Sequence, residues 1–181
     1  MSRLLPRPID TDPALLARGT VLAFDAALAN TGWSVIRNDG EHLDVLNCGC
    51  EHTSSQATSH EKTYQRTDEL MSHLTRLIGN WGHAVDHIVV ERPAVAGHRI
   101  ESALMAAYVV HHVTGGRAVL VSRQHVLSLL LGPGNHTKAQ ARAAARRWIP
   151  DRGAEPFNEH IADAELLGIT HLFDLAHGGV S

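Results

Sequence analysis

Two acidic residues stand at the ends of short apolar runs of the kind that form buried strands. Asp25 ends the run Thr20-Val-Leu-Ala-Phe24, and Glu91 ends the run His87-Ile-Val-Val90. If these strands pair in parallel, the two carboxylates lie about 5 Å apart at one edge of the sheet, which is where open α/β sheets bind ligands. Either acid alone is more simply explained as a strand end that meets solvent. Both together indicate a shared divalent cation.

The last predicted helix supplies a third carboxylate and a histidine. His160 and Asp163 are three residues apart near the start of this helix, so they share one face. This face can dock beside the same sheet edge. Asp163 also suits the helix dipole, so a plain capping role is a competing interpretation. Asp174 lies several turns farther along the same face, where we expect a solvated charge.

Three converging carboxylates suit Mg²⁺, which keeps several waters and takes a few carboxylates together with phosphate oxygens of a substrate. Two such ions can activate a water and stabilise the leaving oxygen when a phosphodiester is cleaved. The pattern therefore predicts a nuclease with Mg²⁺ as its cofactor. Mn²⁺ should serve at least as well if His160 is a ligand, because imidazole suits Mn²⁺ better than Mg²⁺.

Hydrophobic periodicity and turn residues predict the elements that position these side chains. Strands are expected at 20–25, 32–37, 43–48, 87–91 and 118–121, and helices at 58–81, 100–113, 123–131, 137–150 and 158–175. Thr58 with Glu61, and Thr137 with Gln140, have the spacing of capping boxes. The order βββαβαβα predicts an α/β domain with a mixed five-stranded sheet flanked by helices. Residues 1–18 are expected to form a peripheral arm with Asp12 as a helix N-cap, and residues 19–181 a single domain.

Composition sets limits on the class of protein. The 181 residues are 44% hydrophobic and 4% aromatic, which suits one aliphatic core. No apolar run is long enough to span a membrane and the N-terminus has no secretion pattern, so a cytoplasmic protein is expected. A net charge of −3 is weak support for a nucleic-acid binder. The local charge differs, because five basic residues cluster with one acid among them: Lys138, Arg142, Arg146, Arg147, Asp151 and Arg152.

Several short segments, in order along the chain, resemble those of the RuvC-type Holliday junction resolvases, which have a ribonuclease H-like fold. The segments are Val21-Leu-Ala-Phe-Asp25 with Thr31-Gly32, Ile88-Val-Val-Glu91, Ser122-Arg123-Gln124-His-Val126, Lys138-Ala-Gln140 and His160-Ile-Ala-Asp163. Each match is short, but their order and spacing are fairly specific. Two departures are that Asp25 is followed by two alanines where the family has Pro-Gly, and that the loop after Glu91 has no aromatic residue.

The resemblance implies an endonuclease that resolves four-way junctions or other branched DNA by paired phosphodiester hydrolysis. It implies a metal site of Asp25, Glu91, His160 and Asp163, with Lys138 near the scissile phosphate or exposed in a first helical turn. Paired nicks on symmetry-related strands require two sites, so a homodimer is expected. Its contact surface is expected on the apolar faces of the helices at 70–81 and 100–113, unless these faces only pack the core. The sequence identifies no accessory branch-migration partner.

Other classes fit parts of the pattern. Asp25 with Thr31-Gly32 resembles the first phosphate loop of the actin and sugar-kinase superfamily, but such ATPases need a second lobe for which this chain is too short. A nuclease for RNA–DNA hybrids and a junction-binding protein without activity share the fold. The retained acidic positions argue against the inactive protein, because the fold alone does not require them.

Overall fold

Five strands form one mixed sheet in the order β3-β2-β1-β4-β5 in the computed structural model, which describes residues 10–54, 60–93, 100–150 and 157–179. The strands are β1 (Gly19–Asp25), β2 (Asn30–Asn38), β3 (Leu43–His52), β4 (His87–Arg92) and β5 (Val119–Ser122). β1 pairs antiparallel with β2 and parallel with β4, and β4 pairs parallel with β5. The carboxyl ends of β1, β4 and β5 therefore meet at one edge.

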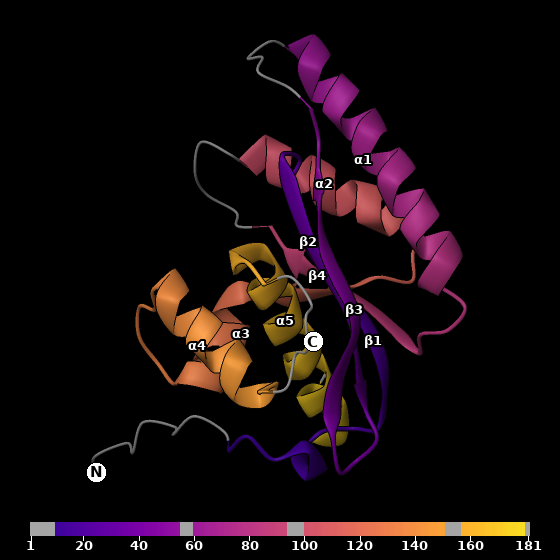
Figure 1. Ribbon diagram of the computed structural model, residues 1–181. Helices are drawn as coiled ribbons and strands as arrows, with labels where there is room; N and C mark the ends of the chain where they lie inside the picture. The colour runs from indigo at the N-terminus through magenta and orange to yellow at the C-terminus, as the bar shows by residue number, and fades with distance from the viewer. Residues whose placement is uncertain (1–9, 55–59, 94–99, 151–156, 180–181) are drawn as a thin grey trace.

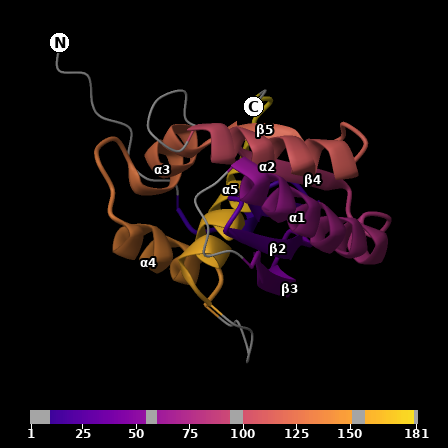
Figure 2. The same cartoon turned by 90° about the horizontal axis from the view of Figure 1, so that it is seen from above.

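Helices cover both faces of this sheet (Figure 1). Those on one face are α1 (His60–Trp81) and α2 (Ile100–Val113), and those on the other are α3 (Arg123–Leu131), α4 (Lys138–Trp148) and α5 (Glu159–Ala176). Figure 2 shows α5 between the sheet and the outer pair α3 and α4. The layers of the domain are thus, in order, α1 with α2, the sheet, α5, and the outer pair α3 with α4.

The alternation of side chains along the central strand separates two hydrophobic cores. Val21 and Ala23 belong to the core shared with α3, α4 and α5, whereas Leu22 and Phe24 belong to the core shared with α1 and α2. All four are fully buried. A strand that is apolar on both faces is expected when helices cover both sides of a sheet.

Two glycines let α5 lie close to the sheet. A Cβ atom at Gly32 of β2 would stand 2.3 Å from the backbone carbonyl of His160, and one at Gly168 of α5 would stand 2.7 Å from Ile36. A distance of 2.3 Å to backbone cannot be relieved by moving a side chain. Gly32 therefore fixes how closely the start of α5 approaches the carboxyl end of β1, because Gly32 pairs with Asp25 in the sheet.

The predicted elements agree with those observed, and α2 and α3 have the expected bounds. The capping box at Thr137 and Gln140 is present at the start of α4. Thr58, the predicted cap of α1, lies outside the described residues. In the predicted arm, Asp12 caps the short 3-10 helix Pro13–Leu15, and Leu16 packs in the core. Within the described residues, no helix is both long enough and apolar enough to cross a membrane.

Candidate active site

Asp25 and Glu91 lie side by side at the carboxyl edge of the sheet. β1 and β4 are in register with Phe24 opposite Val90, so the next residue on each strand is one of these acids. Strand alternation places Asp25 on the face of Ala23 and Glu91 on the face of Val89, and both of these residues belong to the core on the α5 side. The two carboxylates therefore project from adjacent strands toward the same helix.

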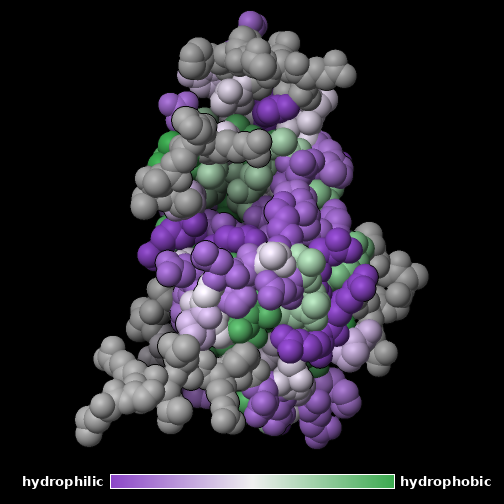
Figure 3. All heavy atoms as spheres, turned by 90° about the vertical axis from the view of Figure 1, so that its left-hand side faces the viewer, coloured by the Kyte–Doolittle hydropathy of each residue, from purple (hydrophilic) through white to green (hydrophobic). Residues whose placement is uncertain are grey.

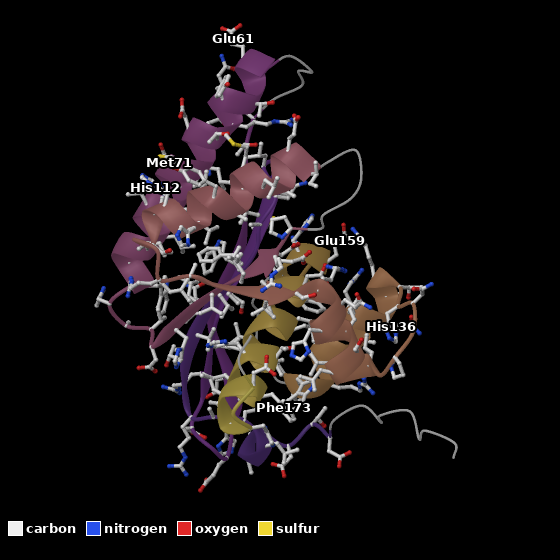
Figure 4. The ribbon with its side chains drawn as sticks, turned by 180° about the vertical axis from the view of Figure 1, so that it is seen from behind. Glu61, Met71, His112, His136, Glu159 and Phe173 are labelled. Atoms are coloured by element: carbon white, nitrogen blue, oxygen red, sulfur yellow. The ribbon has the colours of Figure 1, made fainter. Side chains whose placement is uncertain are left out.

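The start of α5 brings His160 and Asp163 to this edge. The side chain of Asn158 caps the helix by accepting a hydrogen bond of 2.9 Å from the backbone N–H of Ile161. One helical turn separates His160 from Asp163, so both point to the same side. Glu159, labelled in Figure 4, marks this end of α5, and Phe173 lies near the other end. The four predicted site residues thus come together from β1, β4 and α5.

His160 is bound directly to the first carboxylate. Its Nδ1 lies 2.8 Å from Oδ2 of Asp25, and the ring N–H donates to the carboxylate oxygen. This hydrogen bond raises the pKa of His160 above its ordinary value, and the nearby charge of Asp25 adds to the effect while partial burial opposes it. The imidazole therefore keeps its proton to a higher pH than a free histidine.

Arg123 bridges the other two carboxylates. Its Nη1 donates to Oδ2 of Asp163 at 2.8 Å and to Oε2 of Glu91 at 3.3 Å, and its Nη2 donates to Oδ1 of Asp163 at 3.4 Å. Burial disfavours the charge of Arg123, but the hydrogen bond and the charges of these acids raise its pKa. Arg123 was not among the residues predicted for the site. A signal was present, because Arg123 follows β5 at the edge where Asp25 and Glu91 end their strands.

Negative charge remains crowded at this edge despite the arginine. Burial raises the pKa of Glu91 to about 7, with the charge of Asp25 adding to this and Arg123 opposing it. Burial also raises the pKa of Asp163, against its hydrogen bond with Arg123. The charge of Asp25 also adds to the raised pKa of Asp163. Asp25, Glu91 and Asp163 together provide the oxygen donors that Mg²⁺ or Mn²⁺ takes.

The side chains do not yet stand in the geometry of a bound ion. Over the described ranges, no group of three or more His, Cys, Asp or Glu side chains is arranged to hold a metal. The oxygens face Arg123 and His160 instead. The donor set therefore fits a divalent cation in its chemistry, and these two side chains must change their contacts when one binds.

Lys138 lies beside the site, in contact with Glu159, the residue that precedes His160. Its Nζ donates to Oε1 of Glu159 at 2.6 Å; the side chain of Lys138 is exposed and that of Glu159 is partly exposed. Its charge lowers the pKa of His160 and of Asp163, although it is the smallest of the causes in each case. Lys138 thus stands beside the candidate metal ligands without contacting any of their carboxylates in the described hydrogen bonds.

A cavity of about 940 Å³ opens next to Glu91 and Arg123. The rest of its lining comes from the ends of β4 and β5, from α3 and from the loop after α3: Arg92, Pro93, Ser122, Gln124, Leu127, Ser128, Gly134, Asn135 and His136. His136, labelled in Figure 4, belongs to the segment between α3 and α4. The cavity is large enough for part of a polynucleotide strand at the carboxylate edge.

The expectation for Asp174 was wrong. Its side chain is buried and both carboxylate oxygens lie 3.0 Å from Nε2 of His125. Helix α3 carries His125 and covers this part of α5, which the periodicity of α5 alone does not reveal. Asp174 therefore ties α5 to α3 far from the candidate metal ligands.

Comparisons with known proteins identify one family. The protein-family model described as crossover junction endodeoxyribonuclease RuvC matches residues 21–171. The chain is similar to two proteins of that name. The one from Bartonella bacilliformis is 24% identical over 83% of this chain and 89% of the relative, and the one from Akkermansia muciniphila is 26% identical over 84% and 90%.

Solved structures share the fold. The RuvC of Thermus thermophilus in complex with a Holliday junction substrate matches with a TM-score of 0.69 and 20% identity, covering 88% of this chain and 96% of that one. A yeast mitochondrial Holliday junction resolvase matches with a TM-score of 0.57 and 11% identity, covering 91% and 87%. These matches confirm the predicted ribonuclease H-like α/β fold.

Proposed function

The chain belongs to the RuvC family of crossover junction endodeoxyribonucleases, whose model matches residues 21–171, and we propose that it cleaves four-way DNA junctions by metal-dependent phosphodiester hydrolysis. The observation that carries the proposal is the convergence of Asp25, Glu91 and Asp163 at one sheet edge, where burial and the nearby charge of Asp25 raise the pKa of Glu91 to about 7. A fold does not require such a cluster of charge, whereas a divalent cation does.

Asp25, Glu91 and Asp163 are the proposed metal ligands, with Mg²⁺ as the cofactor and Mn²⁺ as an effective substitute. When bound, such ions supply an activated water and stabilise the leaving oxygen. His160 is proposed as a fourth ligand or as a proton carrier. Its Nδ1 is held by Asp25 and its Nε2 is 3.9 Å from Glu159, so the ring has a fixed orientation at the edge of the site.

Basic and polar side chains next to the site are proposed to hold the DNA backbone. The face that carries α3 and α4 is predominantly hydrophilic (Figure 3). On α4, Arg142, Arg146 and Arg147 are exposed, and Lys138 at the start of the same helix can exchange Glu159 for a phosphate. These positions suit contacts that place the strand without reading its sequence.

A two-fold homodimer is proposed because paired nicks require two sites. The apolar face of α1 predicted for this role is mostly used inside the fold, since Leu70, Leu74 and Leu77 are buried in the core. On α2, however, Leu104 and Tyr108 are more than half exposed and lie four residues apart on one face. This face is the proposed contact surface.

The test compares labelled four-way junction, linear duplex, single strand and RNA–DNA hybrid at equal concentration, each with Mg²⁺ and with EDTA. We expect paired nicks in the junction with Mg²⁺ only, and at most slow cleavage of the other three. Faster cleavage of the hybrid would assign a different nuclease activity to the same site. Junction binding without any cleavage in Mg²⁺ or Mn²⁺ would assign a binding protein.

A further inference from the structure

We propose that Arg123 is a phosphate-binding residue that changes partner during the reaction, releasing Glu91 and Asp163 to the metal when the DNA backbone enters the adjacent cavity. The inference rests on the proposed function and adds a residue and an order of events to it. Its consequence is that metal and junction bind cooperatively, with Arg123 as the link between them.

The first support is that Arg123 binds two of the carboxylates that the metal needs. The guanidinium contacts one oxygen of Glu91 and both oxygens of Asp163. Each of these carboxylates must turn an oxygen toward a divalent ion in order to ligate it, and a guanidinium at the same atoms opposes the ion by like charge.

The second support is the lack of space between these groups. The gap between Glu91, Arg123 and Asp163, whose other walls are Val126, Leu127 and Leu167, has a volume of about 10 Å³, which is at most the room of one water molecule. Mg²⁺ and Mn²⁺ keep several waters when they bind to a few carboxylates. A hydrated ion therefore does not fit into this gap while the guanidinium stays where it is.

The third support is that the side chain of Arg123 has open space beside it into which it can move. Its side chain is 37% exposed, in contrast to Asp163 at 11%, and it lines the large cavity on its open side. Ser122 and Gln124, which flank it at the start of α3, line the same cavity. The planar fork that now binds Asp163 through two nitrogens has the geometry to bind a phosphate in the same two-point manner.

Linkage gives the size and the reciprocity of the effect. A phosphate that holds the guanidinium removes the competitor of the metal, so bound junction must strengthen metal binding, and bound metal must strengthen junction binding by the same factor. Coupling between two sites in proteins is typically about 5-fold to 150-fold. We expect a factor in this range for the wild-type chain.

The experiment measures metal binding and not only cleavage. Mn²⁺ affinity of the full chain without DNA is measured by electron paramagnetic resonance for wild type, Arg123→Gln, Arg123→Lys and the control Arg92→Gln. Arg92 lines the same cavity and is exposed, so its variant removes an equal charge from the same wall. Arg123→Gln should bind Mn²⁺ about fivefold more tightly or better, whereas Arg92→Gln should differ from wild type only slightly.

A second arm measures junction affinity by fluorescence anisotropy in EDTA and in Ca²⁺, with gels to verify that the junction stays uncut. Wild type should bind the junction at least about fivefold more tightly in Ca²⁺, and Arg123→Gln should lose most of this difference. This wild-type comparison tests the link even if an Arg123 variant fails to fold.

Two results would overturn the proposal. One is wild-type junction affinity that does not depend on the metal. The other is a folded Arg123→Gln protein with equal or weaker Mn²⁺ affinity than wild type, which would make Arg123 a fixed organiser of the carboxylates. Either result together with metal-dependent junction cleavage by wild type would leave the proposed function standing. A wild-type chain that binds no Mn²⁺ and cuts no junction would remove both.

Discussion

The imidazole of His160 and the carboxylate of Asp25 meet at 2.8 Å across a sequence separation of 135 residues. This contact joins the carboxyl end of the first strand to the start of the last helix. It is possible because the backbone of β2 at Gly32 has no side chain to hold α5 away. The same approach that forms the hydrogen bond also brings Asp163 to Glu91 through Arg123.

The raised pKa of His160 predicts the pH dependence of cleavage. A protonated imidazole cannot ligate a metal, and its hydrogen bond to Asp25 raises the pKa of His160 above its ordinary value. Metal affinity and cleavage should therefore begin to fall while the pH is still above about 6.5, and continue to fall as the solution becomes more acidic. Rates across pH with Mg²⁺ and with Mn²⁺ measure this, and Mn²⁺ should be at least as effective.

Substitutions of His160 test the assignment. His160→Ala should reduce cleavage at least about a hundredfold, the lower range for loss of a group that transfers protons. His160→Asp should restore part of the activity and move the pH profile toward acid, because a carboxylate is available at lower pH. If His160→Ala cuts junctions at the wild-type rate across pH with either metal, the histidine is a bystander.

The ionised carboxylate of Glu91 should lower the free energy of unfolding at neutral pH. The folded pKa of about 7 exceeds the ordinary value of 4.5, so the folded state binds more protons than the unfolded state between these limits. The free energy of unfolding then decreases as the pH rises from 4.5 through about 7. Glu91→Gln removes this penalty and should raise the free energy of unfolding at pH 8 by about 1–2 kcal/mol.

Urea unfolding in EDTA at pH 8 and at pH 4 measures the Glu91 effect. The gain should vanish at pH 4, where the wild-type carboxyl is already protonated. Glu41→Gln, which changes an exposed acid in the turn between β2 and β3, is the matched control and should change little at either pH. A Glu91→Gln protein that is less stable than wild type at pH 8 would show that the contact with Arg123 outweighs the crowding.

Much of the site could be predicted from the sequence because strand ends are visible there. The apolar runs before Asp25 and Glu91 define two buried strands, and parallel pairing puts their ends at one edge. The three-residue spacing of His160 and Asp163 placed both on one face of a helix. The five short segments that resemble one family, in the order of the chain, predicted the fold.

The remaining contacts depend on packing that no local pattern encodes. We expected only acidic residues at the edge where the strands end. The cation Arg123 was therefore missed, although it follows β5 at that edge. Asp174 was expected in solvent because the sequence does not say that α3 covers α5 and supplies His125. The glycine at position 32 was recognised as part of a motif, but its role in the approach of α5 required the structure.

Exposed arginines on α4 should account for part of the salt dependence of DNA binding. Arg142 and Arg146 lie 6.0 and 5.0 Å from the ring of Phe157, and Arg147 is exposed beside them. Replacing all three by Gln should weaken binding to junctions of any sequence and reduce the slope of log affinity against log salt by about one per lost phosphate contact. Arg76→Gln, on α1 across the sheet, is the control. An unchanged slope in the triple variant would place the DNA elsewhere.

The exposed apolar pair on α2 should control assembly. Leu104→Glu with Tyr108→Glu puts like charges on both sides of an isologous contact, so a dimer held by this face should dissociate. Sedimentation of wild type and variant, each with and without junction DNA, measures the state. In the variant, the second nick in each junction should also follow the first after a delay. A wild-type chain that is monomeric on and off DNA would contradict the proposed dimer.

The most direct test of the account is the rate of junction cleavage by Asp163→Asn at saturating Mg²⁺, with junction binding measured on the same preparation. Asparagine keeps the size of the side chain and removes the charge that the metal needs. We predict a loss of at least about 10³-fold in rate, about 4 kcal/mol of the barrier, while the junction dissociation constant measured in EDTA, where no metal contributes, stays within about threefold of wild type, or less than about 1 kcal/mol. The equivalent Asp25→Asn and Glu91→Gln proteins should behave alike. Cleavage by Asp163→Asn at the wild-type rate would contradict the claim that these carboxylates form one metal-dependent active site.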